Sequence, residues 1–514
     1  MIKYIPESQL SIEEFKTPFE TSLSADNRWV ELSKIVPWDY FASIYIELMS
    51  SNIGRPGLSP RIILGALIIK HKEKLDDRGV ILAIQENIYM QYFVGLKGFS
   101  VEPIFDASLF VEIRKRIGAT TFDQLNLDLI KSASQETDQK HLSKKSKDKK
   151  DGDESCPSNK GKLQMDATVA DQYITFPTDS KLLNSGRKQS EKMIDHLYKI
   201  SENKGTKPRT YRRMLDKSFL NYSKKRNQSK ASHRKMNRKL LEALKRNLKH
   251  INNFLGQFEK QGMPFPFRGK KQKMLWVLHT FYKQQQEMYD QKSNSCKDRI
   301  VSIFQPHVRA IPRGKARARV EFGSKLGVSL DQGFARVNTF SWDAYHEASD
   351  LILQVEAYQA LHGYYPELVQ VDKLYATRAN RKWLKEREIR ITAPALGRKS
   401  KEQLNESYYK KRKRKIEAAE RNHIEAKFGQ GKNGYNLNKI RATLKETSES
   451  WVAAIFFVMN LINYHKVMPS RPFFLITNLI KSIKWPKQLL SECKTPRETL
   501  FFFRPQIFLR NFGN

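Results

Sequence analysis

The stretch ELVQVDKLYATRANRKWLKEREIRITA, residues 367–393, decides the fold class of this 514-residue chain. It opens with a short apolar run, ELVQVD (367–372), which is typical of a buried strand and ends on Asp372. Residues 376–387 show helical periodicity, and IRITA (389–393) reads as a second short strand. Strand, helix and strand in close succession predict an α/β unit, and open α/β sheets place their sites at strand ends such as Asp372.

Further strand patterns lie upstream of this unit. Apolar and β-branched residues surround Asp166 in LQMDATVADQYITF (163–176), and three more short runs follow much later. The tripeptide Asp331-Gln332-Gly333 predicts a hairpin turn between the last two runs. The three runs are ARVEFG (318–323), KLGVSL (325–330) and FARVNTF (334–340).

Helical patterns alternate with these strands. We expect a helix over 346–361, a long charged helix from about 401 through Glu425, and an apolar closing helix over 450–464. This order of elements predicts an α/β core with a mixed central sheet.

Composition divides the chain into four parts. Residues 1–133 form an N-terminal helical domain in which Ser59-Pro60 starts a helix, a second helix covers about 76–95 and a third runs from about 106 to Ile117. Such a domain suits either a helix-turn-helix-like DNA-binding module or a bundle used for dimerisation. Residues 134–162 are polar and low in complexity, which is typical of a flexible linker. The remaining parts are the core (163–465), which carries a basic helical insertion (186–292), and a basic, aromatic-rich tail (466–514).

The charge of the chain points to a polyanionic partner. The formal net charge is +38, and residues 201–250 alone carry 17 Lys and Arg against 3 Asp and Glu. Nucleic acid is the natural partner for such a surface; a membrane surface or an RNA scaffold is the alternative for the whole chain, and a merely solvated basic face is the alternative for the insertion.

Other features narrow the cellular setting. The three cysteines, Cys156, Cys296 and Cys493, are widely spaced, which argues against a disulfide framework or a zinc site and fits a reducing cytoplasm. No signal peptide is visible, and the longest apolar stretch, 452–459, is too short to span a bilayer. We therefore expect a cytoplasmic protein without a membrane partner.

Three carboxylates stand out by their position: Asp166 within a strand, Asp372 at a strand end, and Glu425 on a later helix. Chemistry on phosphodiesters requires ionisation of a water or hydroxyl and neutralisation of the leaving oxygen. Two Mg²⁺ ions held by carboxylates from separate elements can do both. Other acidic residues compete for this role, and Asp331 is better explained by its turn: Asp179, Asp195 and Asp331.

Arg421, Glu425 and Lys432 lie four and seven residues apart in RNHIEAKFGQGK, which places them on one helical face. Composition alone supplies such a pattern by chance, so its meaning depends on the other two carboxylates. Three glycines weaken the helix beyond Glu425 and predict a bent end or a loop at Lys432. They are Gly429, Gly431 and Gly434.

Four segments carry a resemblance to a known family. They are LQMDATVADQYITFPTDSKLL, RAIPRGKARARVEFGSKLGVSLDQGFA, VQVDKLYATRANRKWLKEREIRI and RNHIEAKFGQGKNGYNLNKIRA, and the N-terminal helical region adds to them. Together they resemble the DDE transposases of bacterial insertion sequences, in particular the group with the Tyr-x2-Arg-x3-Glu-x6-Lys (Y-R-E-K) pattern. The Tyr position of that pattern falls on Ala418, and Tyr375 is the aromatic residue near the site that could replace it.

The resemblance implies a ribonuclease-H-like core in which Asp166, Asp372 and Glu425 are catalytic and hold two Mg²⁺ or Mn²⁺ ions. It implies cleavage of double-stranded DNA at element ends and strand transfer into target DNA, by a homodimer in the synaptic complex that is associated with the bacterial nucleoid. A metal-dependent nuclease and a non-catalytic DNA-binding protein descended from a transposase are the alternatives. The cations expected to contact DNA phosphates are Arg421, Lys432, Lys373, Arg378, Arg381, Arg313 and Lys315.

Overall fold

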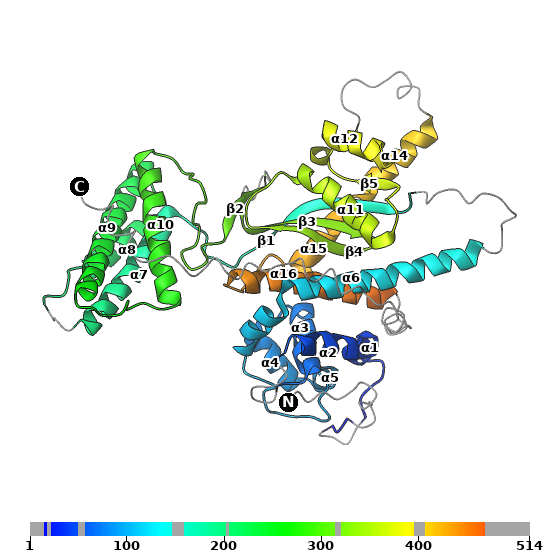
Figure 1. The fold of residues 1–514 in the computed structure, drawn as a ribbon, viewed down its shortest axis with the longest axis horizontal. Helices are drawn as coiled ribbons and strands as arrows, with labels where there is room; N and C mark the ends of the chain where they lie inside the picture. The colour runs from blue at the N-terminus through cyan, green and yellow to red at the C-terminus, as the bar shows by residue number, and fades with distance from the viewer. Residues whose placement is uncertain are drawn as a thin grey trace.

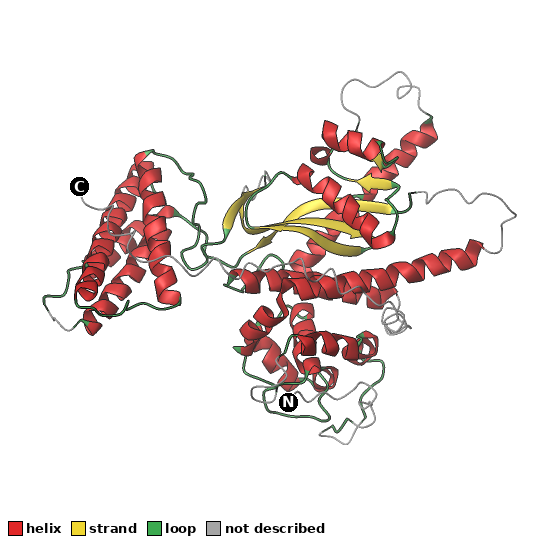
Figure 2. Cartoon of the chain, viewed as in Figure 1, coloured by secondary structure: helices red, strands yellow, loops and turns green. Residues whose placement is uncertain are grey.

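The computed structural model describes residues 15–17, 22–49, 57–145, 159–201, 205–313, 320–394 and 407–467. It contains a mixed sheet with helices on both faces, a group of helices from the N-terminal part, and a separate helical bundle (Figure 1, Figure 2). The prediction of a mixed α/β architecture is confirmed. The expected C-terminal tail, 466–514, lies outside the described residues beyond Val467.

The N-terminal part is helical, as the sequence predicted. The second expected helix is two helices, because the Asn87 side chain accepts hydrogen bonds from the backbone of Tyr89 and Met90 at 3.0 Å each and caps a new helix. The third continues through a kink at Gly118 (φ 70°) to Lys145. The helices are α1 (Arg28–Ile35), α2 (Trp38–Glu47), α3 (Pro60–Lys72), α4 (Asp77–Glu86), α5 (Ile88–Phe93) and α6 (Leu109–Lys145).

The length of α6 corrects the predicted linker. Residues 134–145 are helical rather than extended and flexible, although their polar composition gave no apolar stripe to indicate a helix. Residues 146–158 of the expected linker lie outside the described part of the chain.

The sheet is antiparallel on one side of β1 and parallel on the other. Strand β1 pairs antiparallel with β3 and parallel with β5, which in turn pairs parallel with β6. Both β4 and β2 pair with the far edge of β3, and the β3–β4 turn is formed by Gln332 (φ 47°) and Gly333 (φ 86°), as predicted. The strands are β1 (Lys162–Asp171), β2 (Arg309–Pro312), β3 (Val320–Asp331), β4 (Phe334–Ser341), β5 (Leu368–Gln370) and β6 (Arg390–Ile391).

Different helices cover the two faces of the sheet. Strands β3 and β4 share one apolar core with α16 and the N-terminal helices, whereas β1 and β5 pack against α11 and α12 on the other face. Figure 1 shows α6 and α16 running side by side beneath the sheet. The helices that follow β4 in the chain are η2 (Glu347–Ser349), α11 (Asp350–His362), η3 (Lys373–Tyr375), α12 (Arg378–Lys385), α14 (Tyr408–Glu420), α15 (Asn422–Gly434) and α16 (Lys445–Val467).

Two predicted helices differ in detail. The long charged helix expected through Glu425 is interrupted at Arg421, which ends α14 and starts α15; its expected beginning, residues 401–406, is outside the described chain. The apolar closing helix is confirmed as α16, whose residues from Trp451 through Leu461 are all buried. No helix of the described residues is long and apolar enough to cross a membrane.

The insertion between β1 and β2 is a folded helical bundle with its own apolar core, as expected, and it begins at Asp179 rather than at residue 186. Residues 179–300 carry 31 Lys and Arg against 10 Asp and Glu, a net of +21, so the bundle holds more than half of the excess charge of the chain. It lies apart from the sheet in Figure 1. The bundle consists of α7 (Asp179–Ile200), α8 (Arg212–Ser223), α9 (Lys230–Lys260) and α10 (Lys270–Asp290).

Candidate active site

Asp166 lies within β1, and its side chain is 18% exposed. Burial raises the pKa of its carboxyl group to about 6. The Ala167 backbone N–H donates a hydrogen bond to it at 2.8 Å and lowers this pKa, while the charge of Glu347 raises it, Arg421 lowers it and Glu425 raises it. Several acidic groups therefore gather around one partly buried carboxyl group.

Arg421 joins two of the three predicted carboxylates. Its guanidinium lies 3.4 Å from Asp166 Oδ2 and 2.9 Å from Glu425 Oε1. Because Arg421 is the junction of α14 and α15 and Glu425 follows four residues later, the start of α15 is aimed at the middle of β1. Arg421 and Glu425 thus lie close together, as their four-residue spacing predicted, and Asp166 is a second partner of Arg421.

The register of β1 and β5 relates Asp372 to Asp166. Gln164 lies opposite Gln370 on the parallel neighbour, and their side chains form a hydrogen bond of 2.8 Å. Asp166 and Asp372 each follow two residues later, and alternate residues of a strand share a face. The pairing of β1 with β5 ends at Gln164 and Gln370, so Asp372 lies just beyond it, at the start of η3. Asp372 itself is exposed and accepts a hydrogen bond of 2.6 Å from the Lys373 backbone N–H at the start of η3.

The geometry leaves the shared metal site as a prediction. Within the described ranges, no three side chains of His, Cys, Asp or Glu lie close enough together to hold a metal ion. What the fold brings together is Asp166 with Glu425, through Arg421, whereas Asp372 follows the strand beside β1.

Lys432 belongs to a second ionic cluster. Its ammonium group lies 3.2 Å from Glu321 on β3 and 3.9 Å from Asp171 at the end of β1. Arg313 also pairs with Glu321, at 3.0 Å. Burial and then Glu321 raise the pKa of Asp171 to about 6, while Lys432 and Arg313 lower it.

The expected bend before Lys432 is wrong. Helix α15 continues through Gly434, so Lys432 is on a regular helix. Gly431 has a packing role instead, because a Cβ atom there would lie 3.2 Å from Leu437 and 3.4 Å from Met459. The glycine allows α15 to lie close to α16.

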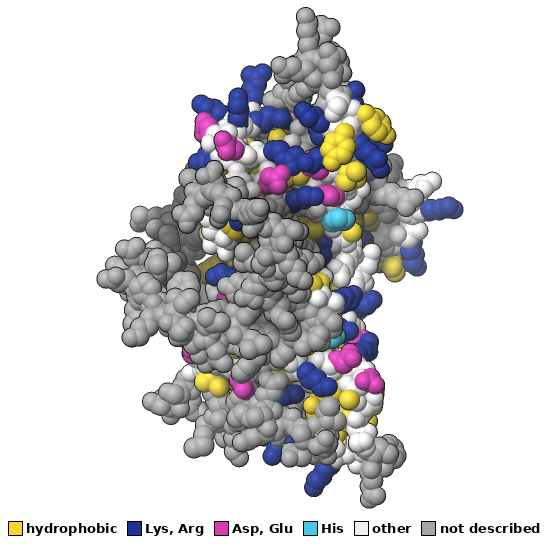
Figure 3. Space-filling view, turned by 90° about the vertical axis from the view of Figure 1, so that its right-hand side faces the viewer, with side chains coloured by type: hydrophobic (Ala, Val, Ile, Leu, Met, Phe, Trp, Pro, Cys, Tyr) yellow, Lys and Arg dark blue, Asp and Glu magenta, His cyan; other side chains and the backbone are white. Residues whose placement is uncertain are grey.

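The other predicted phosphate contacts differ in their surroundings. Lys373 and Arg378 are exposed at the start of η3 and α12. Arg381 donates hydrogen bonds to the backbone carbonyls of Ala376 and Pro394, so its guanidinium holds the chain around α12. Lys315 lies outside the described residues. Figure 3 shows Lys and Arg side chains gathered over the upper part of one face, at the height where α12 and α14 lie in Figure 1.

Tyr375 does not replace the aromatic residue missing at Ala418. Its side chain is fully buried and belongs to the core formed with α11 and α12, so it is not available to a nucleic acid. Ala418 itself is exposed on α14.

Sequence reasoning missed an acidic group next to Asp166. Glu347 lies on η2 and pairs with Lys325 at 3.0 Å, and Asp350, one helical turn on, accepts hydrogen bonds from Tyr345 and Thr339. The segment KLGVSL (325–330) gave a signal for this contact. A glycine inside a strand, here Gly327, often marks a place where another part of the chain packs closely against the backbone. A Cβ atom on Gly327 would lie 2.2 Å from Asp350 Oδ2.

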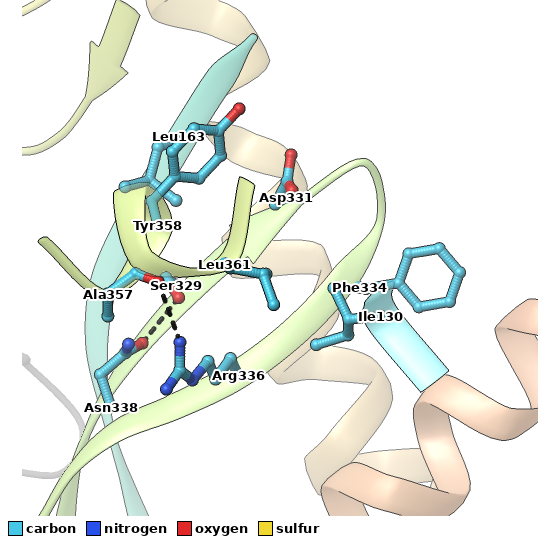
Figure 4. A pocket seen from close by; sticks show the side chains of 10 residues that line it. All are labelled: Ile130, Leu163, Ser329, Asp331, Phe334, Arg336, Asn338, Ala357, Tyr358 and Leu361. Atoms are coloured by element: carbon cyan, nitrogen blue, oxygen red, sulfur yellow. Dashed lines mark hydrogen bonds between the residues drawn. The ribbon is translucent and has the colours of Figure 1, made fainter. Parts of the chain in front are cut away.

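A small cavity lies away from these acidic residues. It is bounded by β3, β4, α11 and α6, where Ser329 bonds to Asn338 at 2.6 Å and Arg336 donates to the Ala357 carbonyl at 3.2 Å (Figure 4). None of the three predicted catalytic carboxylates lines it. Its hydrogen bonds tie the β3–β4 hairpin to α11, which is a structural role.

Comparisons with known proteins agree on one class of protein. Residues 369–462 match the family described as Transposase DDE domain, and residues 17–116 match the Transposase domain (DUF772). The chain is also 27% identical over 168 residues to the uncharacterized protein ORF8 in the nfe locus of Rhizobium meliloti, an overlap that covers 33% of this chain and 73% of that protein. No solved structure matches the chain.

Proposed function

We propose that this chain, which matches a transposase DDE domain and a second transposase domain, acts for a bacterial insertion sequence: it cleaves double-stranded DNA at the ends of such an element and transfers the freed strand into target DNA. Two observations support this proposal. Arg421 contacts both Asp166 and Glu425, and Asp372 follows directly after β5, the parallel neighbour of β1.

The architecture supports a ribonuclease-H-like core for the catalytic domain. The sheet is antiparallel on one side of β1 and parallel on the other, with Asp166 on the central strand and Asp372 just after its parallel neighbour. The segment matched as a DDE domain, residues 369–462, includes Asp372 and Glu425. Assignment to the Y-R-E-K group remains part of the proposal and rests on Arg421, Glu425 and Lys432 alone.

The residues present fit a divalent cation. Three carboxylates supply the hard oxygen donors that Mg²⁺ and Mn²⁺ prefer. The charges of Glu347 and Glu425 act with burial to raise the pKa of Asp166 to about 6, and a bound cation would offset the repulsion among these acids. Asp166, Asp372 and Glu425 would hold the ions. Two such ions, when bound, ionise the attacking water or 3′-hydroxyl and neutralise the leaving oxygen.

The Lys and Arg side chains near the carboxylates either contact DNA phosphates or neutralise neighbouring acidic groups. Arg421 stands between two of the carboxylates, where a planar guanidinium can bind two oxygens of the phosphate at the scissile bond. Lys373 and Arg378 are exposed directly after Asp372 and contact neighbouring phosphates. Lys432 and Arg313 act indirectly, by neutralising Asp171 and Glu321 beside the site.

Two partners complete the proposal. The DNA substrates are the element ends and the target, and two copies of the chain form a homodimer that holds both ends in the synaptic complex. The N-terminal domain serves either DNA binding or this dimerisation, and both uses suit its helical structure.

The test compares the wild-type chain with the Asp372→Asn variant on a supercoiled plasmid that carries the element ends, in the presence of Mg²⁺. We expect nicked, linear and strand-joined products from the wild type and none from the variant, with DNA binding unchanged. Asp343→Asn is the matched control, because Asp343 is a well-exposed aspartate (73%) after β4.

Each other outcome selects a different function. Cleavage that persists in Asp372→Asn would refute the catalytic assignment. Cleavage without strand joining would indicate a nuclease on the same core. DNA binding without cleavage by the wild type would indicate a non-catalytic descendant.

A further inference from the structure

Helix α14 differs from the other helices around the sheet because it has almost no buried face. Residues 410–415 read KKRKRK, all six are exposed, and Glu417 is the one buried residue of the helix. Since successive helical residues turn by about 100°, six consecutive cations point to all sides of the helix axis. At its outer end Tyr408 and Tyr409 are 79% and 75% exposed, so this end does not pack against the described chain.

The inner end of α14 is firmly attached to the sheet. The Gln370 side chain donates to the Glu417 carbonyl at 2.7 Å, and Arg390 on β6 pairs with the Glu417 carboxylate at 3.1 Å. One turn on, Lys162 on β1 pairs with Glu420 at 2.8 Å. The helix is therefore held through its last turn, while its first two turns extend from the edge of the sheet (Figure 1).

The charges of the outer turns call for an anionic partner. Like charges three and four residues apart on a helix repel one another, and within α14 itself no acidic residue precedes Glu417. The positive end of the helix dipole lies at the same place. A chain of phosphates reduces the repulsion among these cations and also their repulsion from the positive end of the helix dipole. Lys and Arg side chains gather on this part of the surface (Figure 3).

The position of α14 relates it to the site. Arg421 follows directly after α14, and a helical rise of 1.5 Å per residue places Lys415 about 9 Å and Lys410 about 17 Å away from it. With 3.4 Å per base pair of B-DNA, these lengths correspond to about three to five base pairs.

We propose that α14 is a DNA-binding arm that contacts the phosphates of double-stranded DNA about three to five base pairs from the phosphodiester bond to be cut. The inference rests on the proposed function for the identity of the DNA, and on α14 alone for the contact. The arm would hold the flanking duplex in a fixed direction relative to Asp166 and Glu425, because its inner end is bonded to β1, β5 and β6.

The first experiment measures binding without cleavage. A mixed-sequence 30-base-pair duplex, a length of about 100 Å at the rise of B-DNA, is titrated in EDTA at several KCl concentrations with the wild type and two variants. The neutral arm carries K410Q, K411Q, R412Q, K413Q, R414Q and K415Q, and the arginine arm carries K410R, K411R, K413R and K415R as the charge-preserving control. Circular dichroism verifies that each variant is folded.

The expected result is a smaller salt dependence in the neutral arm. If three of the six cations contact phosphates, the slope of log K against log[KCl] falls by about 2.7, so that the loss of affinity over a fourfold rise in salt is about 40-fold smaller than in the wild type. The arginine arm keeps the wild-type slope. An unchanged slope and affinity in the neutral arm would overturn the proposal, and so would a change confined to the oligomeric state, which would make α14 a protein interface.

A second experiment tests the position. Hydroxyl-radical footprints of the Asp372→Asn chain on a duplex with the mapped cleavage point should include protection about three to five base pairs away from it, and this protection should vanish when the neutral arm is added. Protection that persists would contradict the assignment. Both readouts are independent of catalysis, so a chain that binds in this way but never cleaves would refute the proposed function and leave the arm intact.

Discussion

At the scale of single residues, the site is dominated by carboxyl groups that share their cations. Asp166 and Glu425 share Arg421, and Asp171 and Glu321 share Lys432. Each pair places one acid on β1 beside an acid from another element. A shared cation offsets the repulsion between the two acidic groups of each pair.

The raised pKa of Asp166 has a consequence for stability. The pKa of Asp166 is about 6 in the folded chain, whereas an aspartate in the unfolded chain has a pKa of about 4. Between about pH 4 and 6 the folded chain therefore keeps a proton that the unfolded chain has lost. The free energy of unfolding falls as the pH rises through this range. Asp166→Asn is neutral at every pH. In EDTA we expect it to exceed the wild type by about 2–3 kcal/mol in unfolding free energy at pH 7.5 and to match it near pH 4.

Urea unfolding at both pH values measures this difference. Asp343→Asn, at an exposed position, is the control and should show no such pH dependence. A difference between Asp166→Asn and the wild type that stays constant from pH 4 to 7.5 would contradict the buried state of this carboxyl group.

At the scale of elements, α15 depends on its contact with α16. Two glycines of the same helix separate packing from helix propensity: a Cβ atom on Gly431 would press on Leu437 and Met459, whereas a Cβ atom on Gly429 would meet nothing within 4 Å. Sequence reasoning treated both as helix breakers. In the fold, Gly431 is required by a close approach and Gly429 is not.

This contrast gives a matched pair of variants. Gly429→Ala should raise the unfolding free energy by about 0.5–1 kcal/mol, because alanine is the better helix former. Gly431→Ala should lose this gain or fall below the wild type, since Leu437 or Met459 must shift to admit the methyl group. Denaturant unfolding measures the free energy of unfolding of both variants. An equal increase at both positions would show that the contact between α15 and α16 has room for a methyl group at Gly431.

At the scale of the whole molecule, two cores are separate. Helix α16 joins the N-terminal helices to β3 and β4 in one core, and Phe457 on α16 packs on Phe41 of α2 with ring centroids 5.4 Å apart. The bundle of α7 to α10 has a different core, which includes the fully buried Leu244. The N-terminal helices and the sheet therefore should unfold together, and the bundle should unfold by itself.

Calorimetry tests this division with one variant in each core. Phe457→Ala should lower only the transition shared by the N-terminal helices and the sheet, by about 3–5 kcal/mol. Leu244→Ala should lower only the transition of the bundle, by about 2–5 kcal/mol. A single transition that responds to both variants would show that the bundle and the sheet unfold as one unit.

Features that depend on neighbouring residues could be predicted from the amino-acid sequence. Apolar periodicity predicted the strand before Asp372 and the closing helix α16, and Gln332-Gly333 predicted the hairpin turn. The sequence predicted a basic helical insertion, and the apolar residues that recur between its charges form the core of the bundle. These signals lie within a few residues of each other, so local conformational preferences suffice to produce them.

The tertiary structure alone decided what depends on distant residues. The pairing of Gln164 with Gln370, 206 positions apart, makes β5 the parallel neighbour of β1, and the partners of Lys432 come from β1 and β3. The continuation of α6 to Lys145 and the break at Arg421 likewise had no local signal in the sequence. The physical reason is that strand register and ion pairing are fixed by the packing of the whole core, in which residues far apart along the chain compete for the same partners.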